Sequence, residues 1–209
     1  MKVLIADDHA VVREGLKLIL NEMDSVSTVE EAQDGHEALA KIKKNRYDLV
    51  ILDISMPGIC GLDILQTMKD NKMKAHVLIL SVHPQEQYAI RALRLGASGY
   101  LSKSSVYEEL ASAIKKVSAG GKYISSAIAE KIVFEKKGDL DKTPHEKLSA
   151  REFQIMCMIA KGKSLTEIAR ELFISDKTVS TYRTRILDKM GMNKNAELTL
   201  YALKNSLIE

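Results

Sequence analysis

Residues 49–58 read LVILDISMPG: four apolar residues, one acid, and then a turn. Two similar runs occur in the first half of the chain, KVLIA at 2–6 before Asp7-Asp8, and VLIL at 77–80 before Ser81. Short, uninterrupted apolar runs are typical of strands that helices cover on both faces of a parallel sheet. The chain is therefore predicted to contain a parallel sheet whose strands end in polar residues.

Helical patterns separate these strands. Two further strands are predicted at 26–32 and 99–101. Amphipathic helices are predicted at 10–22, 35–44, 61–71, 84–95 and 105–118, the last one opened by the capping box Ser105-x-x-Glu108. Five strand–helix units thus fill residues 1–119 and indicate a doubly wound α/β domain, a (βα)5 fold with a five-stranded parallel sheet. Such folds place their sites at the carboxyl ends of the strands.

The last third of the chain predicts only helices. Capping boxes at Ser149-x-x-Glu152 and Ser164-x-x-Glu167 open the first two, and Gly162 closes the first. Ser175 is the predicted cap of a third helix, at 176–190, and a fourth spans about 195–207. Two short helices joined at 173–175 fit a helix-turn-helix.

These patterns divide the chain into three parts. Residues 1–122 form the α/β domain. Residues 123–145 form a linker that holds one amphipathic helix, predicted at 124–135, and a polar stretch. Residues 146–209 form a small all-α domain of four helices.

Composition narrows the class of protein. The excess of Lys and Arg over Asp and Glu is three in the 209 residues, and all of it falls within residues 143–209, which permits a polyanionic partner there. No apolar run approaches the roughly 18 residues of a membrane span, so we expect a cytoplasmic protein with no membrane partner. Cys60 and Cys157 have no metal-ligand spacing, and we expect buried free thiols.

Polar residues should converge at one edge of the predicted sheet. They are three carboxylates, a hydroxyl and an ammonium group: Asp7, Asp8, Asp53, Ser81 and Lys103. Singly, Asp8 could cap a helix, Asp53 could be a turn residue and Lys103 a solvated charge. Together they favour a site, because neighbouring carboxylates repel unless a cation joins them, and such oxygen ligands suit Mg²⁺. A carboxylate beside Mg²⁺ can act as a nucleophile toward phosphorus.

Residues 1–119 resemble a response-regulator receiver domain. The resemblance rests on Asp7-Asp8, on Asp53 within LDISMPGICGLD, and on Ser81, Tyr100 and Lys103. It implies Mg²⁺-dependent transfer of phosphate from a sensor histidine kinase to Asp53. The implied metal ligands are Asp8, Asp53 and the backbone carbonyl of Ser55, with Asp7 in the same acidic pocket. The implied phosphoryl-binding and switch residues are Ser81, Lys103 and Tyr100. Ser104 departs from the proline that often follows this lysine.

The helix predicted at 176–190 has two faces. At 100° per residue, one face is apolar and should pack inward: Val179, Tyr182, Ile186 and Met190. The opposite face carries cations and short hydroxyl side chains: Lys177, Ser180, Thr181, Thr184 and Arg185. Cations can hold phosphates, and small side chains let a helix approach base edges, although an ordinary solvated face has a similar composition.

The C-terminal domain resembles the helix-turn-helix of NarL/LuxR-type (FixJ-like) regulators. The matching residues are Leu148-Ser149-x-Arg151-Glu152, Ile168-Ala169, Ser175, Lys177-Thr178-Val179 and Lys189-Met190. The resemblance implies DNA contacts by Lys177, Ser180, Thr181 and Thr184. Family members often have a lysine where Ser180 or Thr184 stands, so the base contacts should differ here.

The last predicted helix has two apolar stripes. One contains Ala196, Leu200, Leu203 and Leu207, and we expect it to face the core. The other contains Leu198, Tyr201 and Ala202, and we expect it to support a homodimer when the protein is phosphorylated or bound to paired DNA half-sites.

Three rival functions fit the sequence less well. A phosphatase with an aspartate nucleophile would want a second acid two residues after Asp53, where Ser55 stands. A dinucleotide enzyme would want G-x-G-x-x-G after the first strand. A regulator that senses a small molecule would not need the acidic cluster. The sequence therefore predicts a transcription regulator rather than an enzyme, with DNA, a sensor kinase and, as a further candidate, RNA polymerase as partners.

Overall fold

The computed structural model describes residues 1–81, 86–124, 143–205 and 207–208. The chain divides into two compact units, Met1–Val133 and Phe134–Glu209, and each is described by itself. The helix predicted at 124–135 and the rest of the predicted linker fall almost wholly outside the described residues.

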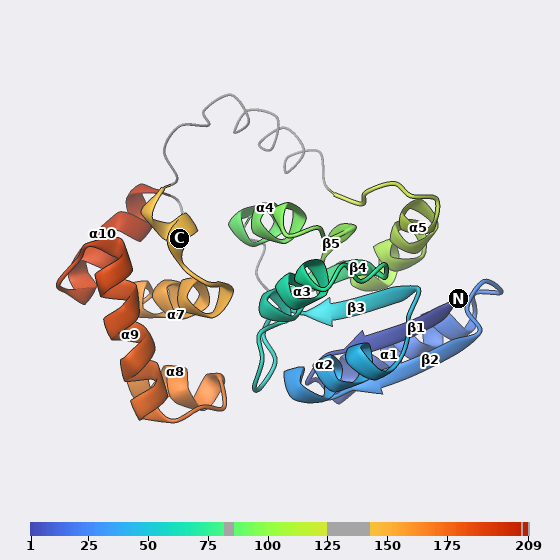
Figure 1. Cartoon of the computed structure of the whole chain (residues 1–209), viewed down its shortest axis with the longest axis horizontal. Coiled ribbons are helices and arrows are strands. Elements are labelled where there is room, and N and C mark those ends of the chain that lie inside the picture. Colours follow the sequence, from blue (N-terminus) through green and yellow to red (C-terminus); the bar gives the residue numbers. More distant parts are fainter. Residues whose placement is uncertain (82–85, 125–142, 206, 209) are drawn as a thin grey trace. The chain divides into compact units, whose positions relative to one another are not determined.

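The first unit contains the predicted parallel sheet (Figure 1). Its strands are β1 (Lys2–Ala6), β2 (Thr28–Ala32), β3 (Leu49–Asp53), β4 (His76–Ser81) and β5 (Gly99–Ser102). They are parallel and lie in the order β2-β1-β3-β4-β5. Every residue of β3 is buried, as its apolar run predicts for a central strand. The α/β fold expected from the sequence is confirmed.

Helices cover both faces of this sheet (Figure 1). They are α1 (Ala10–Asn21), α2 (Gly35–Lys44), α3 (Gly61–Asp70), α4 (Glu86–Arg94) and α5 (Val106–Ser118). Alternate strand residues, among them Ile5, Ile51 and Leu80, form one core cluster with Leu16 of α1 and Leu110 of α5. Because a crossover helix follows each of the first four strands, all five strands run the same way, and their carboxyl ends meet at one edge.

The cap predicted for α5 is wrong. Ser105 precedes the helix, but its side chain makes no capping hydrogen bond. Its backbone has φ −112° and ψ 2°, which is outside the extended conformation that lets an N-cap side chain reach the helix N–H groups. The backbone carbonyl of Ser105 instead accepts from the N–H groups of Glu108 and Glu109.

The second unit is all helical, as predicted. Its elements are η1 (Pro144–Lys147), α7 (Ala150–Ala160), α8 (Leu165–Glu171), α9 (Asp176–Met190) and α10 (Asn195–Lys204). Both predicted capping boxes form, at Ser149 and at Ser164, and Ser175 caps α9. Helix α7 contacts α8, α9 and α10 and is the centre of this unit.

The turn between α8 and α9 has an unusual backbone. Phe173 has φ 52°, a left-handed conformation that costs a side chain about 1–2 kcal/mol. Its ring is 69% exposed. The strained residue lets the chain turn from α8 into the cap of α9, which completes a helix-turn-helix.

Two expectations from composition can be compared with the structure. Cys60 and Cys157 are both buried free thiols, as expected. Within the described ranges, no helix combines the length and apolarity that crossing a membrane requires.

Candidate functional site

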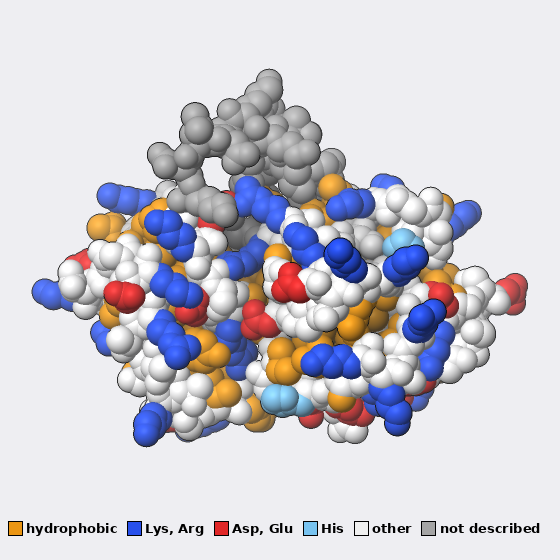
Figure 2. Space-filling view, viewed as in Figure 1, with side chains coloured by type: hydrophobic (Ala, Val, Ile, Leu, Met, Phe, Trp, Pro, Cys, Tyr) orange, Lys and Arg blue, Asp and Glu red, His pale blue; other side chains and the backbone are white. Residues whose placement is uncertain are grey.

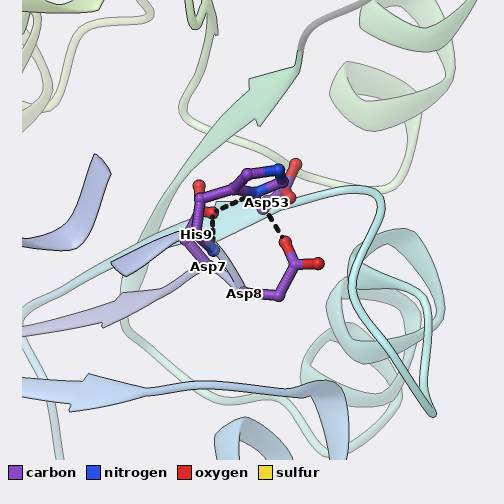
Figure 3. A group of neighbouring side chains, drawn as sticks. All are labelled: Asp7, Asp8, His9 and Asp53. Carbon is purple, nitrogen blue, oxygen red and sulfur yellow. Dashed lines mark hydrogen bonds and ion pairs between the residues drawn. The ribbon is translucent and has the colours of Figure 1, made fainter. Parts of the chain in front are cut away.

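The carboxyl ends of β1 and β3 bring the acidic residues together (Figure 3). Asp7 and Asp8 follow β1, and Asp53 is the last residue of β3, two strands that pair directly. Ligand atoms of Asp7, Asp8, His9 and Asp53 all lie within 4.8 Å of one another. The convergence expected from the sequence is therefore present.

Lys103 lies in the middle of the acidic groups. Its Nζ atom is 2.8 Å from Oδ2 of Asp53 and 2.7 Å from Oδ2 of Asp7. Its side chain is only 9% exposed, so it is not a solvated surface charge. Burial by itself lowers the pKa of Lys103, but Asp53 and Asp7 outweigh it and the pKa lies above the ordinary value. The ammonium group therefore stays charged in the pocket.

Asp53 carries a destabilised negative charge. It is 1% exposed, and this burial is the main reason that its pKa is raised to about 6. The neighbouring Asp7 raises the pKa further, while Lys103 and the backbone N–H of Ser55, which donates to the carboxylate, lower it. A second cation in the pocket would relieve this cost.

The surroundings of two carboxylate oxygens in the cluster bear on whether a metal ion fits there. Oδ2 of Asp7 and Oδ1 of Asp8 are buried and lack a hydrogen bond of acceptable geometry, although Nζ of Lys103 lies 2.7 Å from the first and Nδ1 of His9 lies 2.8 Å from the second. Buried carboxylate oxygens that accept no hydrogen bond are costly unless a cation binds them. Together with Asp53 they offer the hard oxygen ligands that Mg²⁺ prefers. The residues present fit a Mg²⁺ ion.

Ser81 and Tyr100 lie at the same edge. Ser81 ends β4 and is buried, and Tyr100 of β5 is 8% exposed. The two hydroxyl groups share a hydrogen bond, while burial raises the pKa of Tyr100 to about 12. Tyr100 therefore lies inward, beside Ser81. The peptide bond between Lys103 and Ser104 is trans.

Sequence reasoning missed two residues of this pocket. His9 donates its backbone N–H to Asp7, and its Nδ1 lies 2.8 Å from Oδ1 of Asp8. Gly61 begins α3, and a Cβ atom there would lie 2.0 Å from the carbonyl oxygen of Asp53. Only glycine lets α3 approach the end of β3 so closely. The second glycine of LDISMPGICGLD, which is Gly61, was the available signal in the sequence.

The exposed face of α9 is as predicted. All five candidate DNA contacts are exposed: Lys177, Ser180, Thr181, Thr184 and Arg185. Opposite them Val179, Ile186 and Met190 are buried, while Tyr182 is only half-buried. The hydroxyl of Thr181 donates to the carbonyl of Lys177, and that of Thr184 to the carbonyl of Ser180.

The assignment of faces on α10 is wrong. Leu198 and Ala202 are fully buried, so they cannot support a dimer as an exposed surface. Tyr201 is half-buried, and its hydroxyl lies 2.8 Å from Nδ1 of His145. Leu200 and Leu203, expected in the core, are 56% and 51% exposed. Both stripes are apolar, and the packing of α10 against α7 decides which is buried.

Comparisons with known proteins assign both units. Residues 3–115 match the model of the response regulator receiver domain. Residues 146–202 match the model of the LuxR family of bacterial regulatory proteins. The chain belongs to the LuxR-type response regulators. It is 36% identical to the response regulator UvrY of Escherichia coli over 99% of this chain and 95% of UvrY. It is 38% identical to the oxygen regulatory protein NreC of Staphylococcus carnosus over the full length of both.

A solved structure of a relative has the same fold. RcsB of Salmonella enterica serovar Typhimurium, bound to promoter DNA in the presence of the phosphomimetic BeF3−, has a TM-score of 0.61 at 25% identity, covering 96% of this response regulator and 97% of RcsB. Family membership makes the chain a two-component response regulator with a receiver and a DNA-binding helix-turn-helix domain, a transcription regulator and not an enzyme.

Proposed function

We propose that Asp53 accepts a phosphoryl group from the phosphohistidine of a sensor histidine kinase, and that this controls dimerisation and sequence-specific DNA binding. The observation that carries the proposal is the position of Asp53 at the end of a buried strand, bonded to Lys103 and surrounded by Asp7 and Asp8. The cytoplasmic location expected from the sequence belongs to the same proposal, as does contact with RNA polymerase.

The chemistry assigns a role to each side chain. A carboxylate oxygen of Asp53 forms the new bond to phosphorus while the phosphorus–nitrogen bond of the donor breaks. Lys103, already 2.8 Å from Asp53, would neutralise a phosphoryl oxygen. Ser81 would donate a hydrogen bond to another, leaving its partner Tyr100 free to change position. Such a change biases an equilibrium between two states.

Magnesium would be held by Asp8, Asp53 and the carbonyl of Ser55, with Asp7 beside them. Asp7, Asp8 and Asp53 together carry more negative charge than the ammonium group of Lys103 balances, which supports this assignment. When bound, the ion would supply positive charge to the transferred phosphoryl group.

Labelling tests the phosphoacceptor. Acetyl phosphate carrying ³²P, with Mg²⁺, should label the wild-type chain, and hydroxylamine should remove the label, as expected for an acyl phosphate. Asp53→Asn should abolish labelling, while Asp24→Asn, an exposed acid outside the pocket, should not alter it. Label of undiminished amount on Asp53→Asn would reject the proposal, and so would a chain that takes up none.

The exposed face of α9 is the proposed DNA-reading surface. Support comes from its five exposed cations and hydroxyl residues and from the relative RcsB, described as bound to promoter DNA. Lys177 and Arg185 would hold phosphates. Thr181 and Thr184, whose hydroxyl protons bond to the helix backbone, would contact base edges or thymine methyl groups.

Salt-dependent binding separates these roles. Lys177→Ala should weaken binding to specific and scrambled duplexes alike and lower the salt slope by about one. Thr181→Val, which keeps the branched shape, should change the preference among sites by roughly 1–3 kcal/mol per affected base pair. Equal loss on both duplexes for the threonine variant would show that Thr181 does not read sequence.

The proposed dimer surface on α10 is the stripe of Leu200 and Leu203. Both leucines are more than half exposed, whereas the residues first expected there are buried. A second copy bound to the neighbouring half-site would cover them. Leu200→Asp should abolish cooperative binding to a paired site but leave binding to a single half-site unchanged. The matched control is Glu197→Asp on the same helix. Full cooperativity in Leu200→Asp would place the dimer contact elsewhere.

A further inference from the structure

The receiver domain contains a second concave site, far from Asp53. A hollow of about 950 Å³ opens at the amino ends of β3 and β4, where α2 and α3 end. In Figure 2, hydrophobic side chains are visible between the positions of α2 and α3, and Lys and Arg side chains lie around them. Three residue steps of β3, about 10 Å, separate its lining residue Val50 from Asp53, and the two sites share no side chain.

The floor of the hollow is apolar. It includes Ile42 of α2, Val50 of β3 and Met68 of α3, which are between 0% and 5% exposed, and the half-buried Met73. Methionine side chains are flexible and polarizable, and they adapt to the shape of a bound group. Val50 and Met68 belong to the core of the domain, so the floor is part of a rigid scaffold.

The rim of the hollow is cationic. Lys43, Arg46, Lys72 and Lys74 line it, and all four are exposed. None of them has an ion-pair partner among the residues that the structure describes. Asp48 is the one acid in the described lining, and its Oδ2 accepts a hydrogen bond of 2.6 Å from the backbone N–H of Lys2. The rim therefore carries four cations against the one carboxylate of Asp48, a clear positive excess.

We propose that this hollow binds a small organic anion with an apolar body. Its volume lies within the range of small-molecule sites, about 300–1,000 Å³. The half-buried Met73 would contact the apolar part, and the four rim cations would hold a carboxylate, sulfonate or phosphate group. Nothing in the phosphoacceptor pocket takes part, so this site is independent of Asp53 and of Mg²⁺.

The probe for this site is 8-anilinonaphthalene-1-sulfonate, an aromatic sulfonate, titrated into the full-length chain labelled with ¹³C at its methionine methyl groups. Three of the nine methionines, Met1, Met68 and Met73, line the hollow. Their methyl resonances should shift in a saturable 1:1 manner. Those of Met156 and Met190 in the second unit should stay in place. Shifts that spread over both units, or none up to millimolar probe, would overturn the proposal.

Charge reversal at neighbouring lysines supplies a matched control. Lys43 lines the hollow and Lys44 does not, yet both are exposed in the last turn of α2. Lys43→Glu should lower the affinity for the probe about tenfold, because it places a negative charge beside the negatively charged sulfonate. Lys44→Glu should change the affinity less than twofold. Equal effects of the two variants would mean that net charge, and not this rim, attracts the probe.

An uncharged probe of the same shape tests the apolar floor separately. N-Phenyl-1-naphthylamine lacks the sulfonate, so it should bind more weakly than the sulfonate and should be insensitive to Lys43→Glu. Binding of both probes with the same affinity would reject the role of the cationic rim. Competition by an acidic peptide in place of small anions would also contradict the proposal, since it would identify a protein-binding surface.

Discussion

Replacing Asp53 by asparagine should stabilise the response regulator when no Mg²⁺ is present. Asp53 is buried, its pKa is raised to about 6, and the ordinary value is 3.8. The folded chain therefore holds the ionised carboxylate less well than the unfolded chain does. Asparagine keeps the shape and removes the charge.

The size of the effect follows from the pKa. A difference of about two pKa units, at 1.36 kcal/mol per unit, gives a ceiling of about 3 kcal/mol. This pKa already includes the favourable ion pair with Lys103, which keeps Asp7 as a partner after the substitution. We expect a net stabilisation of about 1–2 kcal/mol at pH 8.

The sign of the pH dependence is fixed by the raised pKa. Below about pH 3 the carboxyl group is protonated in both the folded and the unfolded chain, so its charge costs nothing. As pH rises from the ordinary value of 3.8 through about 6, the folded chain loses the stability that protonation gave. The advantage of Asp53→Asn should therefore be nearly absent at about pH 3 and complete above about pH 7.

Urea unfolding from about pH 3 to about pH 8 in EDTA, followed by circular dichroism, measures the difference. Added Mg²⁺ should stabilise the wild type by mass action and leave Asp53→Asn nearly unchanged. Asp24→Asn, at an exposed acid, controls for the loss of one charge. An Asp53→Asn chain that is less stable than wild type at pH 8, or a difference independent of pH, would refute this reasoning.

Four further substitutions test the packing and the backbone strain. Gly61→Ala would place a Cβ atom 2.0 Å from the carbonyl oxygen of Asp53. It should therefore destabilise the domain by about 1–3 kcal/mol and reduce labelling by phosphodonor. An unaltered labelling rate would contradict the close approach of α3 to the end of β3. Phe173→Asn should stabilise the second unit by about 1 kcal/mol in urea unfolding, because asparagine tolerates φ 52° better; a loss of stability would show that ring contacts outweigh the backbone strain. Leu198→Ala should cost about 2–5 kcal/mol and the exposed Leu200→Ala less than about 0.5 kcal/mol; the reverse order would invalidate the packing of α10.

The pattern of apolar residues in the sequence was enough to predict the α/β fold. A short apolar run that is followed by an acid is typical of a buried parallel strand whose carboxyl end lies at a functional site. The convergence of Asp7, Asp53 and Lys103 followed, because parallel strands end at the same edge. The serine caps of α7 and α8 could also be predicted, since a capping box is a local interaction of residues three apart.

Tertiary packing decided what local patterns could not. The two stripes of α10 are both apolar, and only its contact with α7 buried Leu198 and exposed Leu200. The capping box predicted for α5 does not form, because the turn after β5 determines the backbone conformation of Ser105. This constraint comes from outside the helix. The raised pKa of Asp53 and the cationic rim of the second hollow likewise depend on burial and on residues distant in sequence. Sequence periodicity reports which residues share a face, whereas the neighbour that covers a face exists only in the folded chain.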